Sequence, residues 1–218
     1  MAEGKLIRFN KMQIFLHWTH VAAFLALVIT GLILYLPPLS FLASGSGSRL
    51  IHRIAAVGYM LLPISYLIFA REGMFASAKD IFFRWDRQDF GWFKGAPAFY
   101  FFGDNNSMTP QRKFNTGQRL NYIFIILGSG LIVVTGLVMW FGKGILPREV
   151  FQASVILHDL STIPAVAMTF VHAYLSAIHP VMRASFSSII DGKMDAEFAK
   201  EHHTRWYEEM MAAEKAKA

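Results

Sequence analysis

The stretch IFLHWTHVAAFLALVITGLILYL, residues 14–36, decides the fold class of this chain. It is long and apolar enough to span a bilayer, whose hydrocarbon core needs about 20 residues of helix. Further apolar blocks follow at 51–70, 121–141 and 150–178. Because the backbone must satisfy its own hydrogen bonds in lipid, each block is predicted to be a helix. The sequence therefore predicts an all-α fold, a four-helix transmembrane bundle.

The composition agrees with a single integral-membrane domain over residues 1–218. Hydrophobic residues make up 54% of the chain, 20 residues are phenylalanine, and no internal sequence repeat is apparent. A cleaved signal peptide is the alternative for the first block, since FLASGSG (41–47) could serve as a small-residue cleavage site. The first block is longer than the 7–15 residues typical of a signal core, which favours an uncleaved helix.

Basic residues predict the orientation of the bundle. Of the 21 lysines and arginines, 17 lie in the N-terminal arm, in segment 71–119 or in the tail after residue 178. The positive-inside rule places these parts, and hence both termini, in the cytoplasm. A basic excess on one side is expected of such a protein, so the net charge of +6 gives no reason to expect a nucleic-acid partner.

Two cytoplasmic parts remain outside the predicted helices. Segment 71–119 mixes aromatic and basic residues, which predicts an interfacial element on the membrane lipid with Trp85 and Trp92 at headgroup level. The C-terminal cytoplasmic tail, 191–218, has mixed charge and is predicted to be partly helical. It would either dock a soluble partner or be solvated.

Histidines are the candidate functional residues. The chain has no cysteine, which excludes disulfides, cysteine-held iron–sulfur clusters and c-type haem attachment. Ionisable residues within membrane helices are functional candidates, although a lone histidine could equally be a packed core residue. Close-spaced pairs typical of zinc sites are absent from the predicted helices. The histidines in or at the ends of the apolar blocks are His17, His20, His52, His158, His172 and His179.

The spacing of the histidines predicts two metal centres at different depths. His158 and His172 lie on one face of the last helix, about 21 Å apart, which suits two stacked b-type haems. The directions of the predicted helices match His17 with His172 near the inner surface and His52 with His158 near the outer surface. His20, one turn from His17, could compete for the inner iron.

Several motifs carry a resemblance that extends along nearly the whole chain. They are HW (17–18), RLIH (49–52), FNTGQR (114–119), LH (157–158), HAY (172–174), DGK (191–193) and HHTRWYEE (202–209). Together they resemble the cytochrome b (gamma) subunit of membrane-bound respiratory formate dehydrogenase. The wider family includes b-type cytochromes of nickel–iron hydrogenases. The resemblance favours His17 over His20 as a haem ligand.

This resemblance implies a function and partners. It implies two b haems held by the pairs above, and a cytoplasmic-side quinone site lined by Asn115, Gly117 and Gln118 with His172 adjacent. Electrons would pass from an iron–sulfur (beta) subunit, fed by a molybdenum or tungsten catalytic (alpha) subunit, to menaquinone or ubiquinone. It further implies the bacterial inner membrane and admits a higher oligomer of the complex. No catalytic side chain is assigned on this chain.

Alternatives remain at three points. Asn115 and Thr116 could simply cap the third predicted helix. The chain could be the cytochrome b of a nickel–iron hydrogenase, which would share the histidines but serve another electron donor. It could also be a haem-free membrane anchor or transporter.

Overall fold

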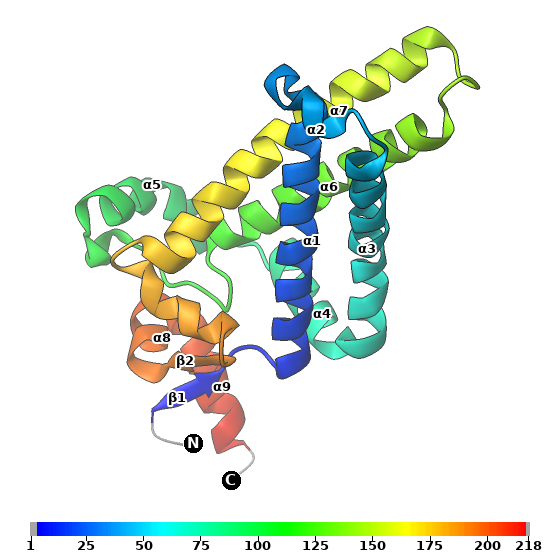
Figure 1. Cartoon of the computed structure of the whole chain (residues 1–218). Coiled ribbons are helices and arrows are strands. Elements are labelled where there is room, and N and C mark those ends of the chain that lie inside the picture. Colours follow the sequence, from blue (N-terminus) through cyan, green and yellow to red (C-terminus); the bar gives the residue numbers. More distant parts are fainter. Residues whose placement is uncertain (1–3, 217–218) are drawn as a thin grey trace.

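The structure is a computed structural model that describes residues 4–216, and it is almost entirely helical (Figure 1). Four of its helices are long and apolar enough to cross a membrane. These are α1 (Lys11–Tyr35), α3 (Gly47–Phe69), α6 (Thr116–Phe141) and α7 (Arg148–Ala173), the last continued by a π-helical turn (Tyr174–Ile178). The prediction of an all-α bundle is confirmed. Each helix begins a few residues earlier than predicted.

The long helices form two hairpins. Helix α1 packs against α3, and α6 packs against α7 (Figure 1). The first hairpin turns through a 3-10 turn (Pro37–Leu39) and the short helix α2 (Ser40–Ala43), and the second through residues 142–147. Helices α3 and α6 are linked by a 2.6 Å hydrogen bond between the hydroxyls of Tyr59 and Ser129.

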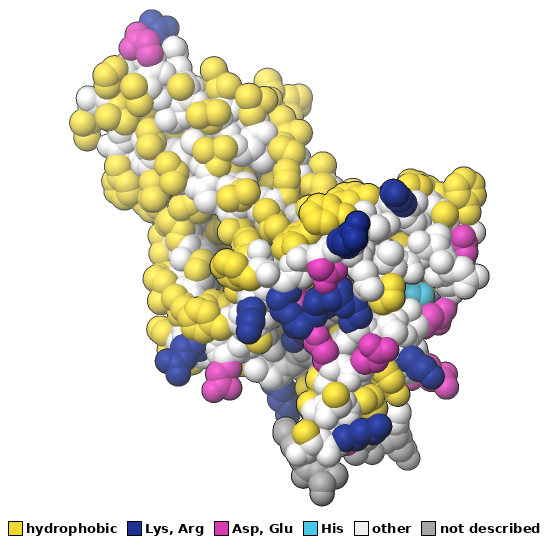
Figure 2. All heavy atoms as spheres, turned by 180° about the vertical axis from the view of Figure 1, so that it is seen from behind, with side chains coloured by type: hydrophobic (Ala, Val, Ile, Leu, Met, Phe, Trp, Pro, Cys, Tyr) yellow, Lys and Arg dark blue, Asp and Glu magenta, His cyan; other side chains and the backbone are white. Residues whose placement is uncertain are grey.

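The surface of the hairpins is apolar, as expected of a protein embedded in lipid. Leucine, isoleucine and phenylalanine side chains are exposed along all four long helices. Figure 2 shows this apolar surface covering most of the hairpins, with the charged side chains gathered mainly at one end. We call this the terminal end, because the described chain begins and finishes there (Figure 1), and we call the opposite end, with the two interhelical connections, the hairpin end.

The terminal end is built from short elements. They are β1 (Lys5–Ile7), α4 (Arg71–Ala78), a π-helical turn (Lys79–Phe83), α5 (Arg87–Phe102), 3-10 turns at Asn105–Ser107 and Met182–Ile189, β2 (Lys193–Asp195), α8 (Ala196–His202) and α9 (Thr204–Lys215). The strands β1 and β2 pair antiparallel, with Leu6 opposite Met194. The sequence analysis did not predict this small sheet.

The C-terminal tail is packed against the rest of the chain, not solvated. Leu6, Met194, Ala199 and Trp206 form a buried cluster that joins β1, β2, α8 and α9. His203 is fully buried and donates from Nδ1 to the carbonyl of Arg112 at 2.7 Å. The described part of the tail is helical, as predicted, but it closes on segment 71–119 of its own chain.

The two tryptophans of segment 71–119 contact other parts of the chain. Trp92 packs against Gly117. The guanidinium carbon of Arg119 lies over Trp85, 4.2 Å from the centre of the indole ring. Both tryptophans are therefore half-buried against the protein. Phe101 and Phe102, at the end of α5, are 82% and 85% exposed, which makes them available to lipid.

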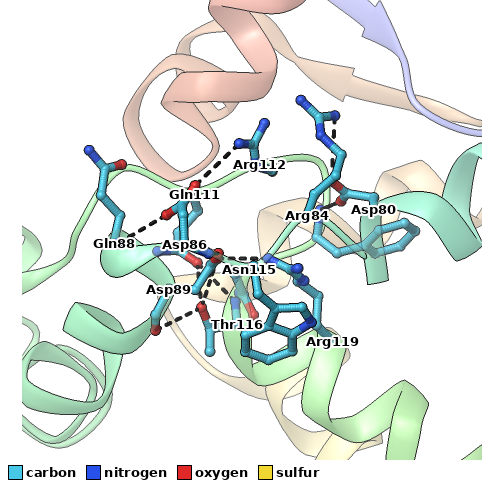
Figure 3. A network of polar contacts seen from close by, with 12 residues as sticks. Asp80, Arg84, Asp86, Gln88, Asp89, Gln111, Arg112, Asn115, Thr116 and Arg119 are labelled. Carbon is cyan, nitrogen blue, oxygen red and sulfur yellow. Dashed lines mark hydrogen bonds and ion pairs between the residues drawn. The ribbon is translucent and has the colours of Figure 1, made fainter. Parts of the chain in front are cut away.

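A buried polar network fixes α5 to the first turn of α6 (Figure 3). Arg119 donates to Asp89 at 2.8 Å, and both side chains are almost fully buried. Thr116 donates its hydroxyl to the same carboxylate at 3.3 Å. At the edge of the network, Asp86 accepts hydrogen bonds from Arg112 and Arg205, which ties α9 to the start of α5.

Candidate functional site

The four candidate ligand histidines lie in two groups at different depths. His17 is on α1 near the terminal end, His52 is on α3 near the hairpin end, and α7 carries both His158 and His172. His17 lies near enough to His172 for their charges to interact, and the same is true of His52 and His158. These pairs are the ones that depth predicts from the sequence. All four side chains are partly exposed.

The hairpin-end pair, His52 and His158, is held by hydrogen bonds at Nδ1. His52 Nδ1 lies 2.8 Å from the hydroxyl of Thr30 on α1. His158 Nδ1 lies 3.1 Å from the hydroxyl of Thr135 on α6. Each imidazole is thus fixed by the partner helix of its own hairpin.

Glycines let these imidazoles approach the neighbouring helix. A Cβ atom at Gly31 would lie 3.7 Å from Cε1 of His52, and one at Gly136 would lie 3.3 Å from Cε1 of His158. The second distance is tighter than ordinary packing. A larger residue than glycine at position 136 would therefore push the imidazole of His158 away from α6.

The terminal-end pair, His17 and His172, has fewer contacts. The ring of His17 meets Trp18 edge-on at 5.5 Å, and its buried Nδ1 has no hydrogen-bond partner in the described chain. The competing His20 packs its ring 4.8 Å from that of Tyr59. His20 is therefore engaged with α3, while His17 keeps an unpartnered ring nitrogen.

These residues fit b-type haem. In the described part of the chain, no hydrogen bond engages Nε2 of His17, His52, His158 or His172. Within that part there is also no cluster of three or more histidine, aspartate or glutamate side chains that could hold a bare ion. Paired imidazoles with free nitrogens suit a metal that brings its own equatorial ligands, as haem iron does.

The residues expected at a quinone site lie together at the start of α6, where they form its cap. Asn115 Oδ1 accepts from the backbone N–H of Gln118 at 2.8 Å, and Gln118 Oε1 accepts from the backbone N–H of Asn115 at 3.1 Å. Gly117 is required by Trp92, since a Cβ there would lie 2.8 Å from the indole. Among residues 4–216, no hydrogen bond joins His172 to these three residues.

Charged and aromatic groups surround this cap. Arg8 donates to Gln118 Oε1 at 3.2 Å, and burial lowers the pKa of Arg8 to about 10. Burial also raises the pKa of Tyr100, which lies near the Asn115 side chain, to about 12. A cavity of about 70 Å³ adjoins Asn115, Gln111 and His202. This volume is well below that of a pocket for a ring-sized ligand.

The sequence analysis missed three polar residues in the bundle. Thr30 and Thr135 face the hairpin-end histidines. Asn121, one turn beyond Gly117, is buried, and its Oδ1 has no hydrogen-bond partner among residues 4–216. Threonine and asparagine within an apolar block give little signal, because small polar residues are also common in helix packing. The only available clue was that TGL occurs in both α1 and α6.

A four-helix membrane bundle that brings histidines together in two pairs at two depths is the architecture of a membrane-spanning b-type cytochrome. The model of the family described as prokaryotic cytochrome b561 matches residues 8–192, and the chain belongs to this family. Membership implies haem b.

Curated relatives agree with this family. The chain is 24% identical to the cytochrome b556(Fdn) subunit of the nitrate-inducible formate dehydrogenase of Escherichia coli, over 92% of this chain and 89% of the relative. It is 24% identical to the formate dehydrogenase cytochrome b556 subunit of Haemophilus influenzae, over 95% and 84%. It is 23% identical to the E. coli cytochrome b556(fdo) subunit, over 98% and 97%.

Proposed function

We propose that this chain is the two-haem cytochrome b subunit of a formate dehydrogenase, and that it passes electrons from an iron–sulfur subunit to membrane quinone. The observation that carries this proposal is the proximity of His52 to His158 and of His17 to His172 at opposite ends of the apolar bundle. The names of the relatives support formate as the source of electrons. Bound haem supplies one-electron chemistry at each depth.

The chain's own residues have distinct tasks in this proposal. His52 and His158 hold the haem on the side of the electron donor, and His17 and His172 hold the one on the quinone side. The apolar helices exclude water from both positions. The orientation predicted from basic residues puts the terminal end in the cytoplasm. Reduction of the quinone there takes up two electrons and two protons, so the protons come from the cytoplasm.

The quinone headgroup is proposed to bind beside the cap formed by Asn115, Gly117 and Gln118. The side-chain amides of Asn115 and Gln118 each keep an NH₂ group, because the cap uses their oxygens. Such groups can donate to quinone carbonyl oxygens. Arg8 and Lys113, whose pKa is lowered by burial to about 8, supply basic groups near the same place.

Reduced-minus-oxidised spectra of the purified protein and four single variants test the haem assignment. His52→Ala and His158→Ala should remove the same one of two low-spin haem signals, and His17→Ala and His172→Ala should remove the other. His20→Ala is the matched control, and it should keep both signals. If both signals survived His158→Ala, the pairing would be wrong.

Purification of the native complex tests the proposed donor. The tagged chain, extracted gently from its own membranes, should bring down an iron–sulfur subunit and a formate-oxidising molybdenum or tungsten subunit. Formate should then reduce its haems, and hydrogen should not. Reduction by hydrogen alone would favour a hydrogenase partner instead.

A further inference from the structure

Thr30 and Thr135 are buried side chains that the proposed function leaves without a task. They are 6% and 4% exposed, in helices whose membrane-spanning surfaces are mostly exposed. Thr30 is the one buried residue in the half of α1 nearer the hairpin end. Thr135 is likewise the one buried residue in the corresponding half of α6. Burial at these two positions coincides with contact to His52 and His158.

The direction of the first hydrogen bond follows from the other contact of Thr30. Its hydroxyl lies 2.6 Å from the carbonyl of Ala26, one turn earlier in α1, and donates its proton there. A lone pair of the hydroxyl oxygen is left to accept from Nδ1–H of His52, at 2.8 Å. The Thr30 hydroxyl also lies 3.3 Å from the carbonyl of Leu27.

The second hairpin repeats these contacts. Thr135 donates to the carbonyl of Leu131 at 2.7 Å and lies 3.1 Å from Nδ1 of His158. The same Nδ1 lies 3.1 Å from the carbonyl of Ile132. A carbonyl can only accept, so Nδ1 carries the proton and Nε2 of His158 keeps its lone pair.

The two hairpins therefore use equivalent parts. In each hairpin, the threonine hydroxyl lies within hydrogen-bond distance of the carbonyls three and four residues before it. A glycine follows the threonine directly. The threonines also occupy the same position counted from the start of α1 and of α6. Ordinary helix packing does not require a hydroxyl and a glycine opposite an imidazole twice over.

We propose that Thr30 and Thr135 are positioning residues for the hairpin-end haem, which hold Nε2 of His52 and His158 toward the iron and increase the electron donation of both imidazoles. The inference rests on the proposed function, since it needs haem between these two histidines. A ligand imidazole whose other N–H is hydrogen-bonded is a more basic ligand with a fixed ring orientation. Greater basicity favours the ferric state and lowers the reduction potential.

Redox titration and low-temperature EPR of the purified holoprotein test the inference. Thr30→Val and Thr135→Val remove the hydroxyl while keeping the side-chain shape. Each should raise the midpoint potential of one haem and shift its low-field g value, and the other haem should stay unchanged. The double variant should shift further. Thr30→Ser and Thr135→Ser should restore both readings, because serine keeps the hydroxyl.

Thr169→Val is the matched control. Its hydroxyl donates only to Ala165 in its own helix, so the hairpin-end haem should keep its potential and spectrum. Unchanged potentials and g values in fully haem-loaded Thr30→Val and Thr135→Val proteins would overturn the inference and leave the proposed function intact. A wild-type protein without haem would overturn both.

If the valine variants lose haem, comparison of serine and alanine variants tests the role of the hydroxyl. Removal of such a hydrogen bond commonly weakens metal retention by about 10–100-fold. In that case, Thr135→Ser should retain the hairpin-end haem and Thr135→Ala should lose it. Equal loss from the serine and alanine variants would contradict a role for the hydroxyl.

Discussion

Arg119 and Asp89 form an ion pair of 2.8 Å in which the two side chains are 0% and 2% exposed. The ring of Trp85 covers the guanidinium of Arg119. Two nitrogens of this guanidinium, Nε and Nη2, have no hydrogen-bond partner in the described chain. This pair joins the interfacial helix α5 to the beginning of α6 (Figure 3). It fixes the position of the cap to which we assign the quinone headgroup.

Replacement of Asp89 by alanine should strongly destabilise the protein. The change leaves the Arg119 charge buried without a partner, which typically costs about 3–5 kcal/mol. Thermal unfolding in detergent, followed by circular dichroism, measures the loss. The double variant Asp89→Ala, Arg119→Met should recover part of it. Glu209→Ala, which breaks partly exposed pairs with Arg84 and Arg112, should cost less than about 1 kcal/mol.

Two substitutions at Asn115 should separate capping from quinone binding. Aspartate caps a helix as well as asparagine does, but a carboxylate cannot donate a hydrogen bond to a carbonyl. Asn115→Asp should therefore keep the melting temperature while raising the KM for quinone. Asn115→Ala should impair both, with about 1 kcal/mol of lost stability. Wild-type quinone kinetics in a stable Asn115→Asp protein would leave Asn115 as a cap alone.

The two glycines opposite the hairpin-end histidines should differ in tolerance. An alanine at Gly136 would press on His158 at 3.3 Å, whereas one at Gly31 would make ordinary contact with His52 at 3.7 Å. Gly136→Ala should therefore broaden or shift the spectrum of one haem, and Gly31→Ala should not. Alanine is also the better helix former by about 1 kcal/mol, so Gly31→Ala should not lower the melting temperature. Equal spectral effects of both substitutions would contradict the difference in space between the two positions.

Docking of the C-terminal tail should weaken as the pH falls. Burial, with a contribution from the charge of Arg8, lowers the pKa of His203 to about 3. An undocked histidine titrates near 6.5, so below this value the undocked tail binds a proton that the docked tail cannot bind. Stability contributed by His203 is thus present above pH 6.5 and is lost as the pH falls toward 3. Over this range, the equilibrium constant for docking of the tail falls by up to about tenfold per pH unit.

Limited proteolysis of the tail at different pH values measures this effect. Cleavage in α8 and α9 should increase on acidification of the wild-type protein. His203→Gln can still donate to the Arg112 carbonyl but does not titrate, so its cleavage should change little between pH 6.5 and 4. The Asp86 pKa is lowered mainly by its hydrogen bond from Arg205, so this contact should persist until below about pH 4. An equally steep pH dependence in both proteins would exclude His203 as its source.

Single cysteines should report the orientation of the bundle, because the natural chain has none. Lys143→Cys, in the α6–α7 connection, should react with a membrane-impermeant maleimide from the periplasmic side. Lys94→Cys, on α5, should react only after the membrane is opened. Phe102→Cys should remain protected in intact lipid and react in detergent, because we expect this exposed side chain to lie in lipid. The reverse labelling pattern for Lys143 and Lys94 would invert the orientation.

The helices were predictable because apolar length is a strong signal. The pairing of the histidines as haem ligands follows from helix direction and stays a prediction. The packing of the tail was not predictable, since it depends on Leu6 meeting Met194 across almost the whole chain. The position of Trp85 and Trp92 at headgroup level stays a prediction. Their contacts within the protein, Trp85 with Arg119 and Trp92 with Gly117, depend on the tertiary fold and leave no signal in the sequence.

The pairing of β1 with β2 has a consequence for the order of assembly. Residues 5–7 are made before all four long helices, yet their partner strand, 193–195, is made only after them. The first strand must therefore wait on the cytoplasmic side in the proposed orientation, with Leu6 uncovered, while the bundle inserts. Closure of this small sheet then requires synthesis through residue 195, and a product that stops before residue 193 would display an open strand edge available to quality-control proteases.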